Sequence, residues 1–82
     1  MELKDAITEL TAKEKTIRFT RLKTICEKFF GSPRINGSHH IFNTGQREQP
    51  TVNFQNRKGK VRFYQVRQVR EALERMLQQE EQ

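Results

Sequence analysis

The sequence predicts an α+β domain, in which helices before and after a three-stranded antiparallel sheet pack on it. Three observations support this class. Apolar residues recur at helical spacing near both ends of the chain, they alternate with polar residues in the middle, and glycine, proline and asparagine separate these stretches. A chain of 82 residues forms one small core. Any chemistry is therefore expected on a surface rather than in a deep pocket.

The first expected helix covers residues 2–14. Its apolar stripe has helical spacing and consists of Leu3, Ala6, Ile7 and Leu10. Residues 11–14 have the form of a capping box, so a second helix could start there or the first could continue. We divide the chain into an amphipathic extension, residues 1–15, and a main domain, residues 16–79. The extension could mediate self-association, contact a protein partner or only pack on the core.

The second expected helix covers residues 21–30. Its stripe is out of register with the first and consists of Leu22, Ile25, Cys26 and Phe29. Thr20 is expected as the N-cap and Gly31 as the residue that follows the helix. Pro33 then prevents its continuation, because proline disfavours helical geometry in the residue before it.

Three strands are expected next, over residues 34–43, 51–55 and 60–63. The first stretch has no helical period, and the second alternates polar and apolar residues, as a strand with one buried face does. Loop residues fill 44–50, and 56–59 have turn composition. The sheet is therefore expected to be a meander of these three strands.

The last expected helix covers residues 64–79. Its apolar stripe is formed by Val66, Val69, Leu73, Met76 and Leu77. Behind the extra N-terminal helix, the elements follow the α-β-β-β-α order of the double-stranded-RNA-binding fold, and one sheet face is left open beside basic loops. Such a face is a workable platform for RNA, although a fold alone does not establish a function.

Charge is segregated along the chain, whose net charge is +6. Residues 1–14 and 71–82 are both net acidic, whereas residues 15–70 hold thirteen bases and only two acids. This distribution is typical of a domain that neutralises phosphates, although a basic surface can also serve solubility alone. The densest run lies between residues 57 and 70, which contain no acid. Its candidate RNA-binding residues are Arg57, Lys58, Lys60, Arg62, Arg67 and Arg70.

Cysteine and histidine usage argues against metal and redox chemistry. Cys26 is the single cysteine, which excludes an internal disulfide, and its place in an apolar stripe predicts a buried hydrophobe. Two adjacent histidines do not supply a zinc ligand set, so no metal or other cofactor is expected. No apolar run approaches the ~20 residues of a membrane span, and we expect a cytoplasmic protein with no membrane contact.

The chemistry-bearing candidates are the adjacent histidines His39 and His40. Histidine exchanges protons near neutral pH, so it can act as the base or the acid of metal-free RNA cleavage. If Phe42 faces the core, strict alternation turns His40 inward and His39 outward, which favours His39 as the catalytic residue. Gly37 could mark a bulge that disturbs this alternation or a close approach of substrate. An ordinary half-buried histidine is the competing interpretation for both, and Ser38 could orient a phosphate or the imidazole.

The segment Gly37-Ser38-His39-His40-Ile41-Phe42 resembles the Gly-Ser-His-x-x-aromatic motif of the HicA toxins, small ribonucleases of type II toxin–antitoxin systems. The similarity covers roughly residues 16–78, including the strand 51–54 and a closing helix with residues 64–69. It departs from the family in one respect. Many relatives carry Pro-x-His after the apolar residues of the second strand, where this chain has Asn53-Phe54-Gln55-Asn56.

The resemblance implies a double-stranded-RNA-binding-like fold and metal-independent cleavage of mRNA, which inhibits translation. It also implies a cognate HicB-like antitoxin that covers the active histidine, and it assigns catalysis to the histidine after Gly-Ser, which is His39 here. We therefore expect an mRNA-cleaving toxin. The alternatives are a non-catalytic RNA-binding module of the same fold, and a protein-interaction domain whose basic face meets an acidic partner.

Overall fold

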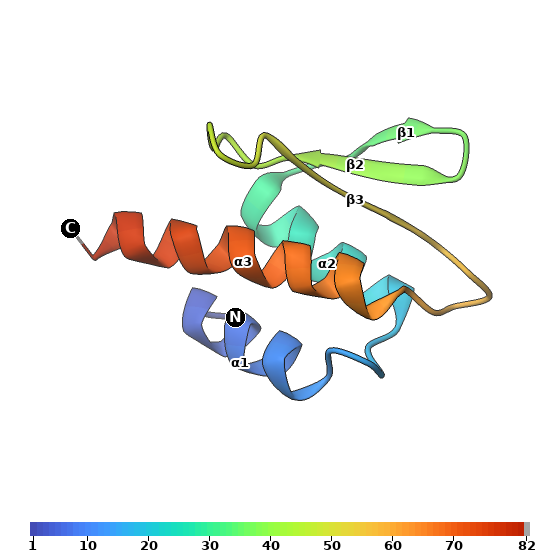
Figure 1. Ribbon diagram of the computed structural model, residues 1–82, viewed down its shortest axis with the longest axis horizontal. Coiled ribbons are helices and arrows are strands. Elements are labelled where there is room, and N and C mark those ends of the chain that lie inside the picture. Colours follow the sequence, from blue (N-terminus) through green and yellow to red (C-terminus); the bar gives the residue numbers. More distant parts are fainter. Residues whose placement is uncertain (82) are drawn as a thin grey trace.

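The computed structural model describes residues 1–81 and confirms an α+β fold of order α-α-β-β-β-α (Figure 1). The antiparallel sheet has three strands in the order β1-β2-β3. The elements are α1 (Leu3–Ala12), α2 (Phe19–Phe30), β1 (Arg34–Asn36), β2 (His39–Asn43), β3 (Thr51–Gln55) and α3 (Phe63–Glu80).

The stretch expected as one strand over residues 34–43 is a hairpin of two strands, β1 and β2. Asn36 pairs with His39, so Gly37 and Ser38 form a two-residue loop between the strands. Gly37 has a φ of +61°, which suits the first central position of a tight hairpin turn. The glycine therefore reverses the chain, and the alternation along β2 begins immediately after it.

The expected strand over residues 60–63 is wrong, because this segment is not in the sheet. Lys60 forms only isolated bridges, to Arg18 and Arg57, and α3 already begins at Phe63. The preceding turn is a tight reversal in which Lys58 and Gly59 both have positive φ and the Arg57 amide donates to the Lys60 carbonyl at 2.9 Å. Pairing after this reversal ends at the Arg57–Lys60 bridge. We call residues 56–60 the cationic turn.

The start of α2 also differs from expectation. The helix begins at Phe19, and Thr20 lies inside it rather than capping it. The Phe19 amide donates to the Gly59 carbonyl at 2.9 Å, so the cationic turn satisfies one of the amides that a helix start leaves without a partner inside the helix. At the other end Gly31 follows the last helical residue with a φ of +85°, in agreement with the prediction.

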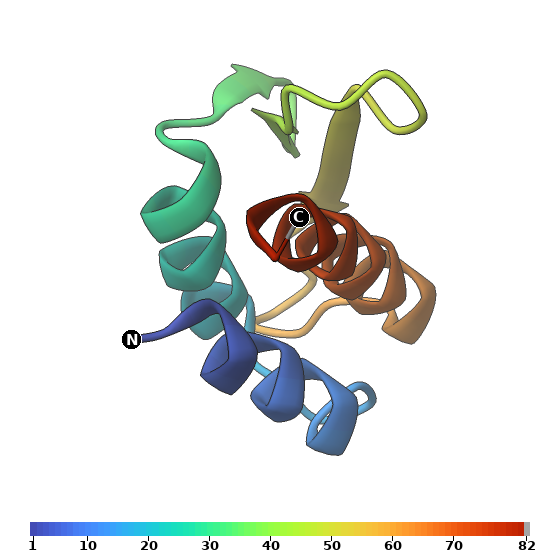
Figure 2. The ribbon, with the colours of Figure 1, turned by 90° about the vertical axis from the view of Figure 1, so that its left-hand side faces the viewer.

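The helices lie on one side of the sheet (Figure 2). α2 and α3 pack against its inner face, and α1 packs on α3 farther from the sheet. All three helices and the inner face contribute to one core. Its largest fully buried side chains are Phe42, Phe54, Leu10, Leu22, Ile25, Leu73, Val52, Val66, Val69 and Cys26.

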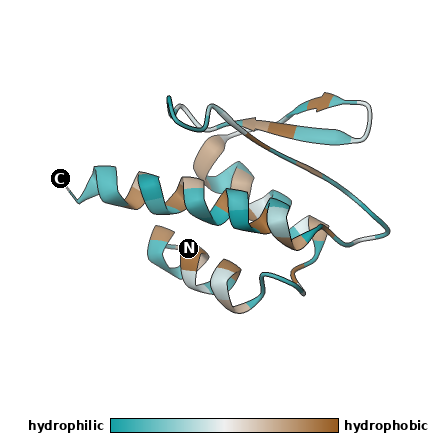
Figure 3. Ribbon diagram, viewed as in Figure 1, coloured by the Kyte–Doolittle hydropathy of each residue, from teal (hydrophilic) through white to brown (hydrophobic). Residues whose placement is uncertain are grey.

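The hydropathy of the residues along each helix agrees with helices that have one buried and one exposed side. Hydrophobic and hydrophilic residues are interspersed along each helix, as in amphipathic helices (Figure 3). The sequence-based interpretation of residues 2–14 as an amphipathic helix agrees with the burial of Leu3, Ala6 and Leu10 in α1. Thr11 does not cap a new helix, since its hydroxyl donates to the Ile7 carbonyl at 2.8 Å. Within residues 1–81, no helix combines the length and apolar character needed to span a bilayer.

Candidate functional site

Within residues 1–81, the helices leave the outer face of the sheet uncovered (Figure 2), and this face is polar. Directly opposed residues in antiparallel strands share a face. His39 is opposite Asn36 and Gln55, which places all three on the outer side, away from Phe42. The same alternation gives the members of what we call the open sheet face: Arg34, Asn36, His39, Ile41, Asn43, Thr51, Asn53 and Gln55. These residues include four amides and no acid.

His39 is held on this face by hydrogen bonds at both ring nitrogens. Its Nδ1 is 2.8 Å from Asn53 Oδ1, and its Nε2 is 2.6 Å from Gln55 Nε2. An amide oxygen only accepts and an amide nitrogen only donates, so Nδ1 donates and Nε2 accepts. The two amides, as they are oriented, match the imidazole tautomer that carries its proton on Nδ1.

Arg57 extends this network. Its Nη1 donates to Gln55 Oε1 at 3.4 Å, a long hydrogen bond at an exposed site. The oxygen of the Gln55 side-chain amide faces the Arg57 guanidinium, so the nitrogen of the same amide faces His39. The cationic turn is thus connected to the imidazole through one amide side chain.

His40 has the opposite orientation, as alternation predicted. It pairs with Phe54 on the inner face, and its ring meets Phe19 edge to face with centroids 4.9 Å apart. The side chain is half-buried, and its Nδ1 is fully buried without a hydrogen-bond partner. These contacts make His40 a packing residue at the edge of the core.

The other candidates cluster near the hairpin loop. Ser38 lines a shallow, open depression of about 510 Å³, together with Gln55, Asn56, Arg57 and Lys58. Lys60 and Arg62 follow in the same connection and are exposed. In Figure 1 the β1–β2 loop, the β3–α3 connection and the start of α3 all lie at the right-hand end of the molecule. Four of the six predicted RNA-binding residues therefore belong to the connection beside the histidine strand.

Arg67 and Arg70 have a different environment. The Arg67 Nε is 3.2 Å and the Arg70 Nη1 is 3.1 Å from Glu14 Oε1. The hydrogen bond from Arg67 is the main cause that holds the pKa of Glu14 below its ordinary value. The run that lacks acids in the sequence thus meets a carboxylate from the α1–α2 connection in space.

Arg18 joins the cations, although sequence reasoning did not single it out. Its guanidinium covers Gly59, where an added Cβ would lie 2.6 Å from Arg18 Nη2. The two residues are forty-one positions apart, so no local pattern connects them. Asn53 and Gln55 were missed for another reason, because only the strand register shows that they flank His39.

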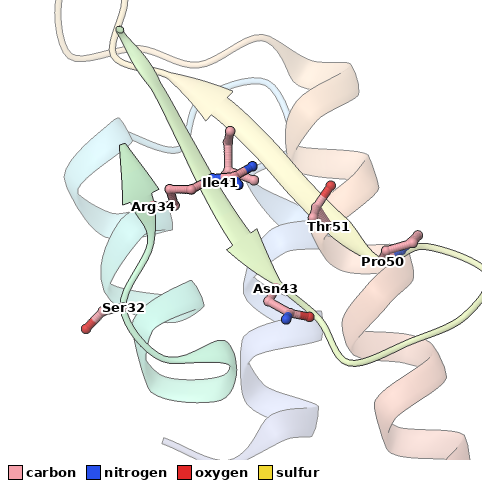
Figure 4. A pocket seen from close by; sticks show the side chains of 6 residues that line it. All are labelled: Ser32, Arg34, Ile41, Asn43, Pro50 and Thr51. Atoms are coloured by element: carbon pink, nitrogen blue, oxygen red, sulfur yellow. The ribbon is translucent and has the colours of Figure 1, made fainter. Parts of the chain in front are cut away.

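A second hollow lies on the open sheet face itself (Figure 4). It has a volume of about 340 Å³ and is lined by Ser32, Arg34, Ile41, Asn43, Pro50 and Thr51. Ile41 is two residues from His39 on the same side of β2. The hollow thus shares a strand face with the imidazole, and its lining combines apolar side chains with a guanidinium and polar groups.

Among residues 1–81, no three His, Cys, Asp or Glu side chains gather as metal ligands would. Cys26 is fully buried, which confirms the prediction of a core residue, and burial raises the pKa of its thiol. No protein-family model, curated protein or solved structure significantly matches the chain. A functional assignment therefore depends on the chemistry of these side chains.

Proposed function

We propose that this chain is a HicA-type endoribonuclease, the toxin of a type II toxin–antitoxin pair, which cleaves mRNA in the cytoplasm and is inhibited by a HicB-like antitoxin. Its fold would be the double-stranded-RNA-binding-like α-β-β-β-α arrangement with α1 added. One observation carries the proposal: the amides around His39 are oriented to bond a tautomer whose Nε2 accepts, on an acid-free face beside several cations. This combination supports proton transfer at a phosphodiester.

In the proposed reaction, His39 Nε2 takes the proton of a ribose 2′-hydroxyl. The 2′-oxygen attacks the adjacent phosphorus, the P–O5′ bond breaks, and the 5′-oxygen leaves with a proton from a general acid. The products are a 2′,3′-cyclic phosphate and a 5′-hydroxyl. Arg57 and Lys58, which line the depression beside Ser38, would stabilise the negative charge that develops on the phosphorane.

Gln55 must leave the Nε2 atom before His39 can act as this base. The contact that orients the Gln55 amide is the long bond from Arg57. A phosphate that binds the Arg57 guanidinium would compete for this donor, and Gln55 could then rotate away. The bond from Nδ1 to Asn53 would meanwhile keep the lone pair on Nε2. Substrate binding would thereby expose the base.

The alternative is a non-catalytic RNA-binding module of the same fold. It is favoured by the same network, because both nitrogens of His39 already have partners, as in a structural histidine. In that case the cations would bind phosphates and no bond would be cleaved.

A cleavage assay in EDTA tests the proposal. Full-length wild type, His39→Ala and His40→Phe are incubated with end-labelled RNA, and the product ends are identified. His40→Phe is the matched control, because its ring faces inward on the same strand. Binding is measured separately with RNA methylated at the 2′-oxygens, which cannot undergo this reaction.

We expect wild type and His40→Phe to produce 2′,3′-cyclic phosphates. Loss of a proton-transfer group costs a factor of ~10² to 10⁴, so His39→Ala should cleave at least about 100-fold more slowly while it binds methylated RNA like wild type. If folded wild type binds RNA and does not cleave it, the binding module is the correct interpretation. If folded wild type does not bind RNA at all, both the ribonuclease and the RNA-binding module are wrong.

A further inference from the structure

Two aromatic rings are exposed at the start of α3. Phe63 is 45% and Tyr64 is 47% exposed, whereas the other aromatic residues of the chain are buried or packed against the core. Their ring centroids are 5.9 Å apart in an edge-to-face arrangement. Packing within the fold does not account for this exposure, because most of the apolar area of such rings is normally removed from water.

Cations surround this pair. Arg62 precedes it, and the Arg67 Cζ lies 5.5 Å from the centre of the Phe63 ring. The Arg67 guanidinium thus covers one face of the Phe63 ring in a cation–π contact, and it also forms a salt bridge with Glu14. Tyr64 has no comparable cover among the contacts of residues 1–81. It is therefore the ring available to a ligand.

Tyr64 is one helical turn before a residue of α3 that is bonded to the loop between β2 and β3. Residues four apart in a helix share a face, so Tyr64 is in line with Gln68. The Gln68 carbonyl accepts a hydrogen bond from Gln49 of that loop at 2.9 Å. Arg67, which lies over the Phe63 ring, bonds Glu14 of the α1–α2 connection instead. The tyrosine thus follows closely on the connection that carries Lys60 and Arg62.

We propose that Tyr64 is a stacking site for an unpaired base of single-stranded RNA, with Arg62 and Lys60 on the flanking phosphates. A π face next to exposed cations matches the two components of a nucleotide, and the acid-free stretch 57–66 adds no repulsion. A base inside a duplex is already stacked on both sides, so the site selects single strands. This proposal rests on the proposed RNA binding, and it adds a base-contacting residue outside the His39 network.

The test measures RNA affinity of full-length variants with 2′-O-methyl RNA, which separates binding from cleavage. Tyr64→Phe keeps the π face, and Tyr64→Leu keeps an apolar side chain without it. Because base stacking on an aromatic ring contributes to the binding free energy, we expect Tyr64→Leu to bind a single strand at least about tenfold more weakly than wild type. Tyr64→Phe, which keeps the ring, should bind like wild type. A hairpin duplex of the same composition should bind Tyr64→Leu and wild type equally. Thermal unfolding checks that each variant is folded.

A direct readout is available because the chain has one tyrosine. In protein labelled with ¹³C-tyrosine, the ring signals of Tyr64 should shift upfield when the single strand is added and should stay in place with the duplex. Equal affinity of wild type and Tyr64→Leu for the single strand, with unmoved ring signals, would overturn the stacking site and leave RNA binding intact. Absence of binding to any RNA would instead overturn the proposed function as well, and a shift produced only by an acidic protein would assign the ring to a protein partner.

Discussion

Replacement of His40 by phenylalanine should stabilise the protein. The His40 Nδ1 is buried without a hydrogen-bond partner, and such an atom costs ~1–3 kcal/mol of folding free energy. Phenylalanine removes the polar atom and keeps an aromatic ring against Phe19. Since the side chain as a whole is only half-buried, we take the lower end of this range. The free energy of unfolding should then rise by ~1 kcal/mol, which corresponds to a Tm increase of about 4–8 °C for a domain of this size.

Urea unfolding followed by circular dichroism measures this change for wild type, His40→Phe and His40→Ala. His40→Ala is the control, because it removes the unpaired nitrogen together with the ring contact to Phe19, and we expect it to be less stable than His40→Phe. A lower urea midpoint for His40→Phe than for wild type, at unchanged slope, would refute the reasoning. It would mean that the imidazole makes a favourable polar interaction that the ring of phenylalanine cannot make.

Three further outcomes are expected. Gln55→Ala frees the Nε2 of His39, so the proposed cleavage should be about fivefold faster, as removal of a competing hydrogen bond of ~1 kcal/mol implies; slower cleavage would show that Gln55 assists the reaction. Hydrogen bonds from arginine lower the pKa of Glu9 and of Glu14, so both carboxylates stabilise the fold above their ordinary pKa of 4.5, and this stability is lost as the pH falls through the lowered values. Urea midpoints measured from pH 7 to pH 3 should therefore fall less for the variant Glu9→Gln/Glu14→Gln than for wild type. Finally, the buried Cys26 should react with a thiol reagent only as fast as the protein opens, and at once in urea; rapid labelling of native protein would contradict its burial.

The helices could be predicted from the sequence because their signal is local. An apolar stripe at helical spacing is complete within about a dozen residues, and it located α1, α2 and α3 to within a few residues. The bounds of the strands were harder to predict from the sequence. Residues 60–63 have strand composition, but pairing ends at the isolated Arg57–Lys60 bridge and α3 already begins at Phe63. The Gly37-Ser38 loop did carry a hairpin signal, since glycine at the first central position is typical of a two-residue turn.

The site was predictable to the extent that it depends on alternation. Once Phe42 faces the core, the orientations of His39 and His40 follow, and the register confirms them. The partners of His39 depend on which strand residues are opposite one another, which composition does not determine. Long-range ion pairs were likewise hidden, since Glu14 meets Arg67 from fifty-three residues away. The catalytic role of His39 remains a prediction.

The position of the cationic turn relative to the histidine strand is set by Arg18 and Phe19, at the start of α2. Arg18 lies over Gly59, and the next residue, Phe19, bonds the Gly59 carbonyl through its amide. The Phe19 ring at the same time packs edge to face against His40 and Phe54. One helix end thus contacts the back of the histidine strand and the turn that carries Arg57 and Lys58. The cations would therefore approach a substrate at His39 from a rigid element rather than from a free loop, which reduces the ordering that binding requires and suits a surface site on a chain too small for a deep pocket.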